Sequence, residues 1–171
     1  MQVFIANGTY DFLENKYKKY FSTESMVLMQ STNQDQATLI HESTGQSFFQ
    51  TPRKFDILYS FGRLENKGYI VINHFSLEDL SKPIFEHKTL QQLEKGSIPC
   101  AAVRLLRAVK GDTYLVLSLW KDSVSFKEWE KSASAQTFPV SASIPDIWKV
   151  KENNLYYSKS YVTYHIIPEK N

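Results

Sequence analysis

The stretch YIVINHF, residues 69–75, predicts a β-strand whose apolar run is interrupted by one amide. Because successive side chains of a strand point to opposite faces, Val71, Asn73 and Phe75 share one face. A buried amide left without hydrogen-bond partners costs about 1–3 kcal/mol. Asn73 therefore either bonds to backbone at a strand end or donates a hydrogen bond into a ligand cleft, and the sequence leaves both interpretations open.

Around this strand the hydrophobic periodicity predicts two halves with the same order of elements. The first half is expected to contain a strand at residues 3–7, a helix at 9–20, a hairpin of 26–29 and 38–41, and a helix up to residue 62 that starts at Thr51-Pro52. The second half is expected to contain the strand 69–75, a helix at 82–94, a hairpin of 101–108 and 113–120, a helix after Asp122, and a closing strand at 161–167.

A β-α-β-β-α-β order is typical of a ferredoxin-like α+β unit, an antiparallel sheet with helices on one face. The other face of such a sheet is bare. We therefore expect residues 1–62, read as βαββα, to act as a built-in partner for a domain of residues 63–171. Covering the bare face within one chain predicts a monomer. A cleft between helices and sheet would suit a flat apolar ligand.

Composition narrows the function classes. The chain mixes 20 basic with 18 acidic residues for a net charge of +2, which is no footprint for nucleic acid. The single cysteine, Cys100, suits a reducing cytoplasm. Neither a signal peptide nor a membrane-length apolar run is present in the sequence, so we expect a cytoplasmic protein with no membrane contact. Hydrolase and nucleotide chemistry are unsupported, because a Ser/His/Asp order and a Gly-rich phosphate loop are absent.

Several short motifs in the second half resemble one family in their order and spacing. They are Asn73, Arg104-Leu-Leu-Arg107, Thr113-Tyr114, Leu117-Ser-Leu-Trp120 and Phe126-Lys-Glu-Trp129. Together they are similar to IsdG-type haem-degrading monooxygenases of the antibiotic biosynthesis monooxygenase superfamily, over residues 68–135. The first half, with Leu39-Ile-His-Glu42, looks like the N-terminal extension of the longer, HmoB-like members.

The resemblance implies an oxidoreductase for which haem is both substrate and cofactor. An external reductant and O2 would open the porphyrin and release iron, as in haem degradation for iron acquisition; the electron donor is not implied. Asn73 matches the strand amide that donates a hydrogen bond near the iron-bound oxygen. Trp129 matches the helix tryptophan that presses on the porphyrin, although a core aromatic is the alternative. The residues expected to line the haem are Val71, Phe75, Phe85, Thr89, Phe126 and Ala133.

One position departs from the family. The proximal histidine lies ten residues after the tryptophan, and this chain has Pro139 there. Neutral imidazole is a normal haem ligand, so the four histidines of the chain are candidates. His74 must point away from the face of Asn73, and His41 and His165 lie elsewhere. His87, on the helix 82–94, is the candidate iron ligand by elimination, against a solvated histidine or a Tyr or Glu ligand such as Glu86.

Two other functions stay open. The chain could be a haem or porphyrin carrier or regulator that kept the pocket without turnover, which the missing histidine favours. It could also be a cofactor-free oxygenase of the same superfamily that acts on an aromatic metabolite.

Overall fold

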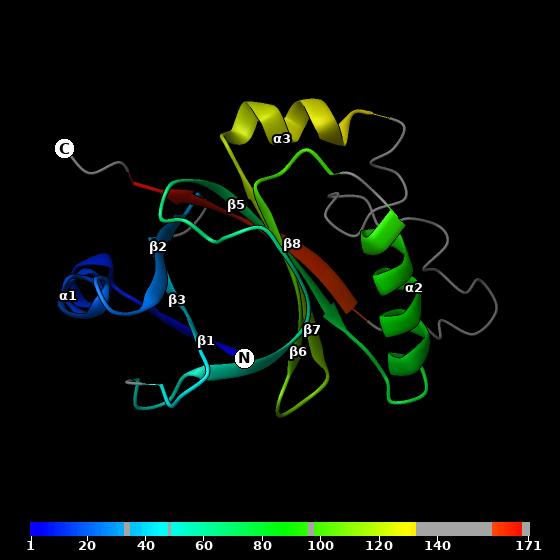
Figure 1. Cartoon of the computed structure of the whole chain (residues 1–171), viewed down its shortest axis with the longest axis horizontal. Coiled ribbons are helices and arrows are strands. Elements are labelled where there is room, and N and C mark those ends of the chain that lie inside the picture. The colour runs from blue at the N-terminus through cyan, green and yellow to red at the C-terminus, as the bar shows by residue number, and fades with distance from the viewer. Residues whose placement is uncertain (33–34, 48, 96–97, 133–158, 169–171) are drawn as a thin grey trace.

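Eight strands close into an antiparallel barrel in the computed structural model, which describes residues 1–32, 35–47, 49–95, 98–132 and 159–168. The described residues form three helices, which lie on the outside of the ring: α1 (Tyr10–Tyr20), α2 (Lys82–Lys95) and α3 (Ser123–Glu130) (Figure 1). Around the barrel the strands follow the order β1 (Gln2–Gly8), β3 (Ala37–Ser43), β2 (Ser25–Ser31), β8 (Lys159–Ile167), β5 (Gly68–Ser76), β7 (Thr113–Trp120), β6 (Ala102–Ala108) and β4 (Arg53–Phe61).

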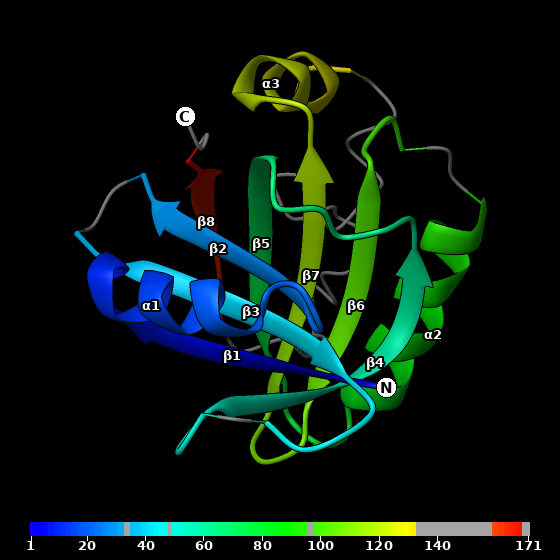
Figure 2. The ribbon, with the colours of Figure 1, turned by 60° about the vertical axis from the view of Figure 1, so that its left-hand side comes forward.

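The two halves of the chain form sheets of the same strand order. The second half runs β8-β5-β7-β6 and carries α2 and α3 at the positions of a ferredoxin-like unit. The first half runs β4-β1-β3-β2 and carries α1 between its first two strands. The halves join at β2–β8 and at β4–β6 (Figure 2). The expected antiparallel, ferredoxin-like arrangement is therefore confirmed, and the sheet closes on itself.

The expected helix that starts at Thr51-Pro52 and ends near residue 62 is wrong. Residues 53–61 form β4, which pairs with β1 and β6. A β-bulge lies between Ile57 and Tyr59, so the side chains before and after it face opposite sides of the sheet. Phe55 therefore packs inside the barrel, while Leu58 and Tyr59 pack on its outside, against the cluster beneath α2 and α3. Apolar residues at positions 55, 58 and 59 have the spacing of one helix face. In the structure the bulge places them on the two sides of a strand.

Three apolar layers follow from strand alternation. The barrel interior holds residues from both halves, among them Val3 and Ile40 from the first and Ile72 and Leu117 from the second. The outer face of the first half is covered by α1, through Leu13 and other residues. The outer face of the second half is covered by α2 and α3. The interior layer thus gives each half-sheet the cover that a bare face needs.

A buried arginine links the halves inside the barrel. Arg104 of β6 is 4% exposed and lies on the interior side of its strand with Leu106. Its Nε donates to Glu42 Oε1 of β3 at 2.8 Å. Its Nη1 and Nη2 donate to the backbone carbonyls of Phe61 and Gly62, at 2.8 and 2.9 Å. One guanidinium thus holds together β6, β3 and the start of the connection between the halves.

Gly62 is the residue that lets the chain turn under this guanidinium. Its φ is +69°, and a Cβ at this position would lie 2.0 Å from the carbonyl oxygen of Ala101. An L side chain is therefore strained by the dihedral angle and excluded by the lack of space.

None of the helices that the structure describes has both the length and the apolar character required to span a lipid bilayer.

Arg104→Met should lower the free energy of unfolding by about 3–5 kcal/mol, because the Glu42 carboxylate stays buried without its partner. The double variant Arg104→Met/Glu42→Leu should recover a substantial part of this loss, because both charges are then gone. Arg63→Met, at an exposed arginine, is the control and should change stability by less than about 0.5 kcal/mol. Urea unfolding followed by far-UV circular dichroism measures all three. Equal losses in the single and double variants would contradict the account.

Candidate functional site

Asn73 lies in the middle of β5 and faces the layer beneath the outer helices. It is 2% exposed, between Val71 and Phe75 on the same face. Its neighbours across the sheet are Val116 of β7 and Val162 of β8. The strand-end explanation for Asn73 does not fit this position, because β5 continues to Ser76.

The structure brings most of the predicted site residues into one buried layer. Asn73 and Thr89 are buried beside the cluster that contains Val71, Phe75, Phe85, Phe126 and Trp129. Strand β5 contributes Val71, Asn73 and Phe75 to this layer. Helix α2 contributes Phe85 and Thr89, and helix α3 contributes Phe126 and Trp129. Ala133 and Pro139 lie outside the residues that the structure describes. We call this cluster, with Asn73 and Thr89, the outer layer.

Trp129 is held by other aromatic rings of the outer layer. Its ring centroid lies 5.2 Å from that of Trp120 and 6.4 Å from that of Phe126. The helix that carries it begins at Asp122, whose Oδ1 accepts from the backbone N–H of Ser125 at 2.8 Å, as the sequence predicts for a cap. The geometry is compatible with a core aromatic and with a ring that presses on a flat ligand.

Thr89 adds a second polar group to the layer. It is 0% exposed on the buried side of α2, and its hydroxyl oxygen has no hydrogen-bond partner. A buried hydroxyl without a partner is costly. The layer thus combines apolar side chains with an amide on its strand and an open hydroxyl on its helix.

The four histidines lie in different surroundings. His87 is on the exposed side of α2, away from the outer layer. His41 is buried in the first half, with Nε2 2.9 Å from Glu24 Oε2. His74 and His165 are buried inside the barrel, where burial lowers the pKa of each to about 4. As the structure stands, the imidazole of His87 does not reach the outer layer, and its role as iron ligand stays a prediction.

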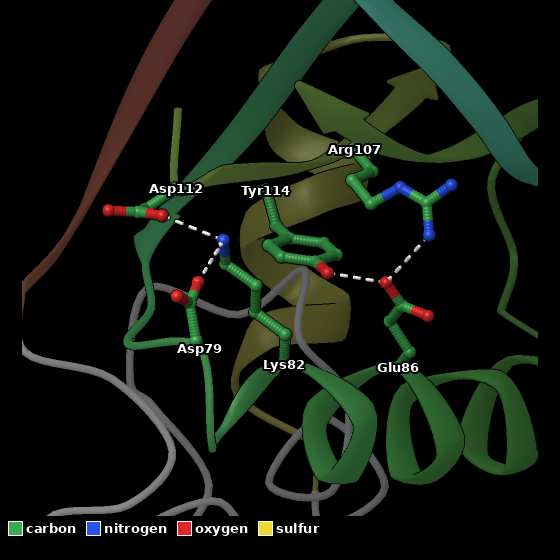
Figure 3. Close-up of polar contacts among 6 residues, drawn as sticks. All are labelled: Asp79, Lys82, Glu86, Arg107, Asp112 and Tyr114. Carbon is green, nitrogen blue, oxygen red and sulfur yellow. Dashed lines mark hydrogen bonds and ion pairs between the residues drawn. The ribbon is translucent and has the colours of Figure 1, made fainter. Parts of the chain in front are cut away.

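A network of charged groups fixes α2 over the sheet (Figure 3). Glu86 Oε1 accepts from the Tyr114 hydroxyl of β7 and, at 3.1 Å, from Arg107 Nη1 of β6. One turn earlier, Lys82 Nζ donates to Asp79 at 2.8 Å and to Asp112 at 2.7 Å. The two contacts tie the first turns of α2 to the β6–β7 hairpin.

The network affects the titration of its members. Burial, followed by the hydrogen bond to the Glu86 carboxylate, raises the pKa of Tyr114. The hydrogen bond to Glu86 also raises the pKa of Arg107. The Glu86 carboxylate therefore already accepts hydrogen bonds from Tyr114 and Arg107. Glu86 could ligate iron only if it gave up these hydrogen bonds. Sequence reasoning missed the network, although the spacing of four between Lys82 and Glu86 places both on one side of the helix.

A large cavity adjoins the outer layer at one end of the barrel. Its volume is about 1130 Å³, and Tyr69 and Trp120 belong to both the cavity wall and the layer. Lys67 and Lys121 also line it. Cys100 is in the same wall, and burial raises the pKa of its thiol to about 11, which keeps it protonated near neutral pH.

Known proteins resemble this chain over almost its whole length. The heme-degrading monooxygenase of Listeria monocytogenes is 29% identical, over 98% of this chain and 95% of its own. A monooxygenase-like protein of Listeria innocua is 28% identical with a TM-score of 0.69, over 99% of this chain and 95% of its own. The heme-degrading enzyme LmHde of Listeria monocytogenes is 25% identical with a TM-score of 0.67, over 98% of this chain and 100% of its own.

The predicted resemblance is confirmed. The chain is a homologue of a heme-degrading monooxygenase, and its structural neighbours include this heme-degrading enzyme and a ferredoxin-fold protein related to antibiotic biosynthesis monooxygenases. The same fold occurs in a major regulator of staphylococcal pathogenesis, with a TM-score of 0.75 over 99% of this chain and all of that one, at 18% identity. That likeness concerns the fold alone. No family model matches the sequence.

Glu86→Gln should lower the free energy of unfolding by about 1–2 kcal/mol, because the hydrogen bonds from Tyr114 and Arg107 lose their charged acceptor. Glu94→Gln, on the exposed side of the same helix, is the control and should stay within about 0.5 kcal/mol of the parent. Urea unfolding measures both variants. If they are equally stable, the network does not fix α2.

Proposed function

We propose that this protein is a haem-degrading monooxygenase that binds haem in the outer layer and opens the porphyrin ring oxidatively. The observation that carries the proposal is the location of Asn73. In a homologue of a heme-degrading monooxygenase, the one amide of the strand faces the layer that contains Trp129. O2 and an external reductant are the co-substrates, and iron is released with the opened ring.

The chemistry of the outer layer supports a haem-like substrate. Its walls are aromatic and aliphatic side chains from a sheet and two helices, which suits a flat apolar ring. Asn73 of β5 and Thr89 of α2 are polar side chains that are buried beside this cluster. Polar groups at the centre of an apolar site fix the orientation of a ligand that has a polar group of its own.

Asn73 and Trp129 have different roles in this proposal. The amide of Asn73 would supply a hydrogen-bond donor where oxygen reacts with the bound haem. The indole of Trp129, backed by Trp120, would contact the porphyrin and strain it. Such strain accelerates a reaction only if it is relieved towards the transition state, so it affects turnover more than binding.

None of the described residues of the outer layer is a histidine. His87 remains the candidate iron ligand, and it needs a haem that reaches the exposed side of α2 or a rotation of that helix. Cys100 is a poor substitute, since its raised pKa leaves little thiolate.

His87→Ala should shift the Soret band of added ferric haem if the imidazole ligates iron. An unchanged band would exclude this role.

A haem or porphyrin carrier is the second candidate function, and Pro139 at the family's histidine position favours it. A carrier would bind haem with no bleaching when a reductant and oxygen are present. A cofactor-free oxygenase, the remaining alternative, would not bind haem at all.

Asn73→Ala should slow haem degradation about tenfold or more while the Soret band of ferric haem stays largely in place, because the amide acts after oxygen arrives. Trp129→Phe keeps an aromatic ring in the layer and should slow degradation more than it weakens binding. Turnover is measured as loss of the Soret band with ascorbate in air, and binding by haem titration. Val124→Ala, on the exposed side of α3, is the control.

The proposal fails if the parent protein does not bleach bound haem, and the carrier function then replaces it. The role of Asn73 fails by itself if its variant degrades haem at the parent rate. If Trp129→Phe weakens binding as much as turnover, the ring holds the substrate rather than straining it.

A further inference from the structure

The barrel wall opens on one side, where β8 departs from β2. Along β5, strand β8 is paired in continuous register from Gly68 to Ser76. Along β2 it is paired only at Gln30 and Ser31, with one more backbone hydrogen bond from Thr32 N–H to the Tyr164 carbonyl. A cavity of about 380 Å³ lies at this opening and reaches the barrel interior, where Ile5, Ile72 and Leu115 line it.

Two buried histidines meet in this cavity through one threonine. Nε2 of His74 lies 2.8 Å from Thr163 Oγ1, and Nε2 of His165 lies 3.0 Å from the same oxygen. A hydroxyl has a single hydrogen, so it can donate to only one of the two rings. At least one imidazole must therefore donate its own N–H to Thr163. Both Nδ1 atoms are buried without a hydrogen-bond partner. The pair is thus incompletely satisfied.

The charge around the pair has one sign. Arg53, at the start of β4, lines the cavity, and its positive charge adds to burial in lowering the pKa of His74. Its guanidinium lies over the Phe55 ring, at 5.2 Å, and forms no ion pair with a carboxylate of the described residues. The other titratable side chain on this wall is Tyr161, which is stacked on His74. Tyr164 also lines the cavity, but its ring stacks on Tyr69 in the outer layer. Asp and Glu do not occur among the described residues that line the cavity.

A cavity with an unpaired guanidinium, polar walls and no carboxylate favours an anion. Ser31, Gln36 and Thr38 also line it and make its wall polar, and the Thr38 hydroxyl donates to Asn7 Oδ1 at 2.8 Å. An oxyanion fits the forked N–H groups of arginine. A negative charge beside the histidines would also offset the field of Arg53 and favour their protonated form, in which both ring nitrogens are donors.

We propose that this cavity is a second ligand site, which binds a small anion bearing a carboxylate or phosphate group through Arg53 and the pair His74 and His165. The site lies on the face of β5 opposite to Asn73, so it is separate from the outer layer and its test involves no haem.

Imidazole ¹⁵N–¹H correlation spectra of the full chain test the site, with acetate and inorganic phosphate as probes. Each anion replaces chloride at constant ionic strength. The resonances of His74 and His165 should shift towards the imidazolium and saturate, while those of exposed His87 stay in place. Saturation with only one of the two probes assigns the preferred group, carboxylate or phosphate.

Arg53→Gln should weaken the apparent affinity about tenfold or more, because the guanidinium supplies the charge. Lys54→Gln is the matched control, since Lys54 is adjacent and does not line this cavity. Shifts that never saturate with either probe would overturn the proposal, as would equal shifts at His87. An Arg53→Gln variant that binds as tightly as the Lys54→Gln control would also overturn it.

Discussion

The ion pair of Arg104 with Glu42 is the contact on which the arrangement of the two halves depends. It joins β6 of the second half to β3 of the first inside the barrel, and it holds the backbone at Phe61 and Gly62. A buried guanidinium is tolerated only when its N–H groups have partners. Since these partners come from separate parts of the chain, the charge is satisfied only when the barrel is closed.

Closure of the barrel also organises the proposed haem site. With both half-sheets covering each other inside, the outer face of the second half is free to pack against α2 and α3. The contacts of Glu86 and Lys82 with the β6–β7 hairpin then set the height of α2 above β5. Strand alternation does the rest, because it turns Asn73 towards the helices and His74 towards the barrel interior. The two faces of β5 therefore lie in two different environments, the outer layer and the barrel interior.

Much of this fold could be predicted from local sequence. Both hairpins, the caps at Thr9 and Asp122 and the face of Asn73 follow from turn residues, capping side chains and alternation. The fourth strand could not be predicted, because the bulge after Ile57 breaks the alternation that identifies strands. Pairing of β2 with β8 and of β4 with β6 joins segments far apart in the sequence, and periodicity carries no information about such pairs.

Part of the candidate site, like part of the fold, could be predicted from the sequence. Strand and helix periodicity select the residues that face the outer layer, but they do not reveal partners across elements. The contact of Glu86 with Tyr114 and Arg107 and the meeting of His74 with His165 at Thr163 both depend on the tertiary structure. The iron ligand has no local signal either, because proline occupies the position at which the resemblance would place it.

Two halves of one chain close this barrel, so neither half-sheet needs a second subunit to cover its inner face. Light scattering of the purified full chain, coupled to size-exclusion chromatography, measures whether a second subunit takes part. A closed barrel leaves no bare sheet face to drive association, so the account predicts one species with the mass of a single chain, 19.8 kDa, across a wide range of protein concentration. A stable species of twice that mass at low concentration would contradict it.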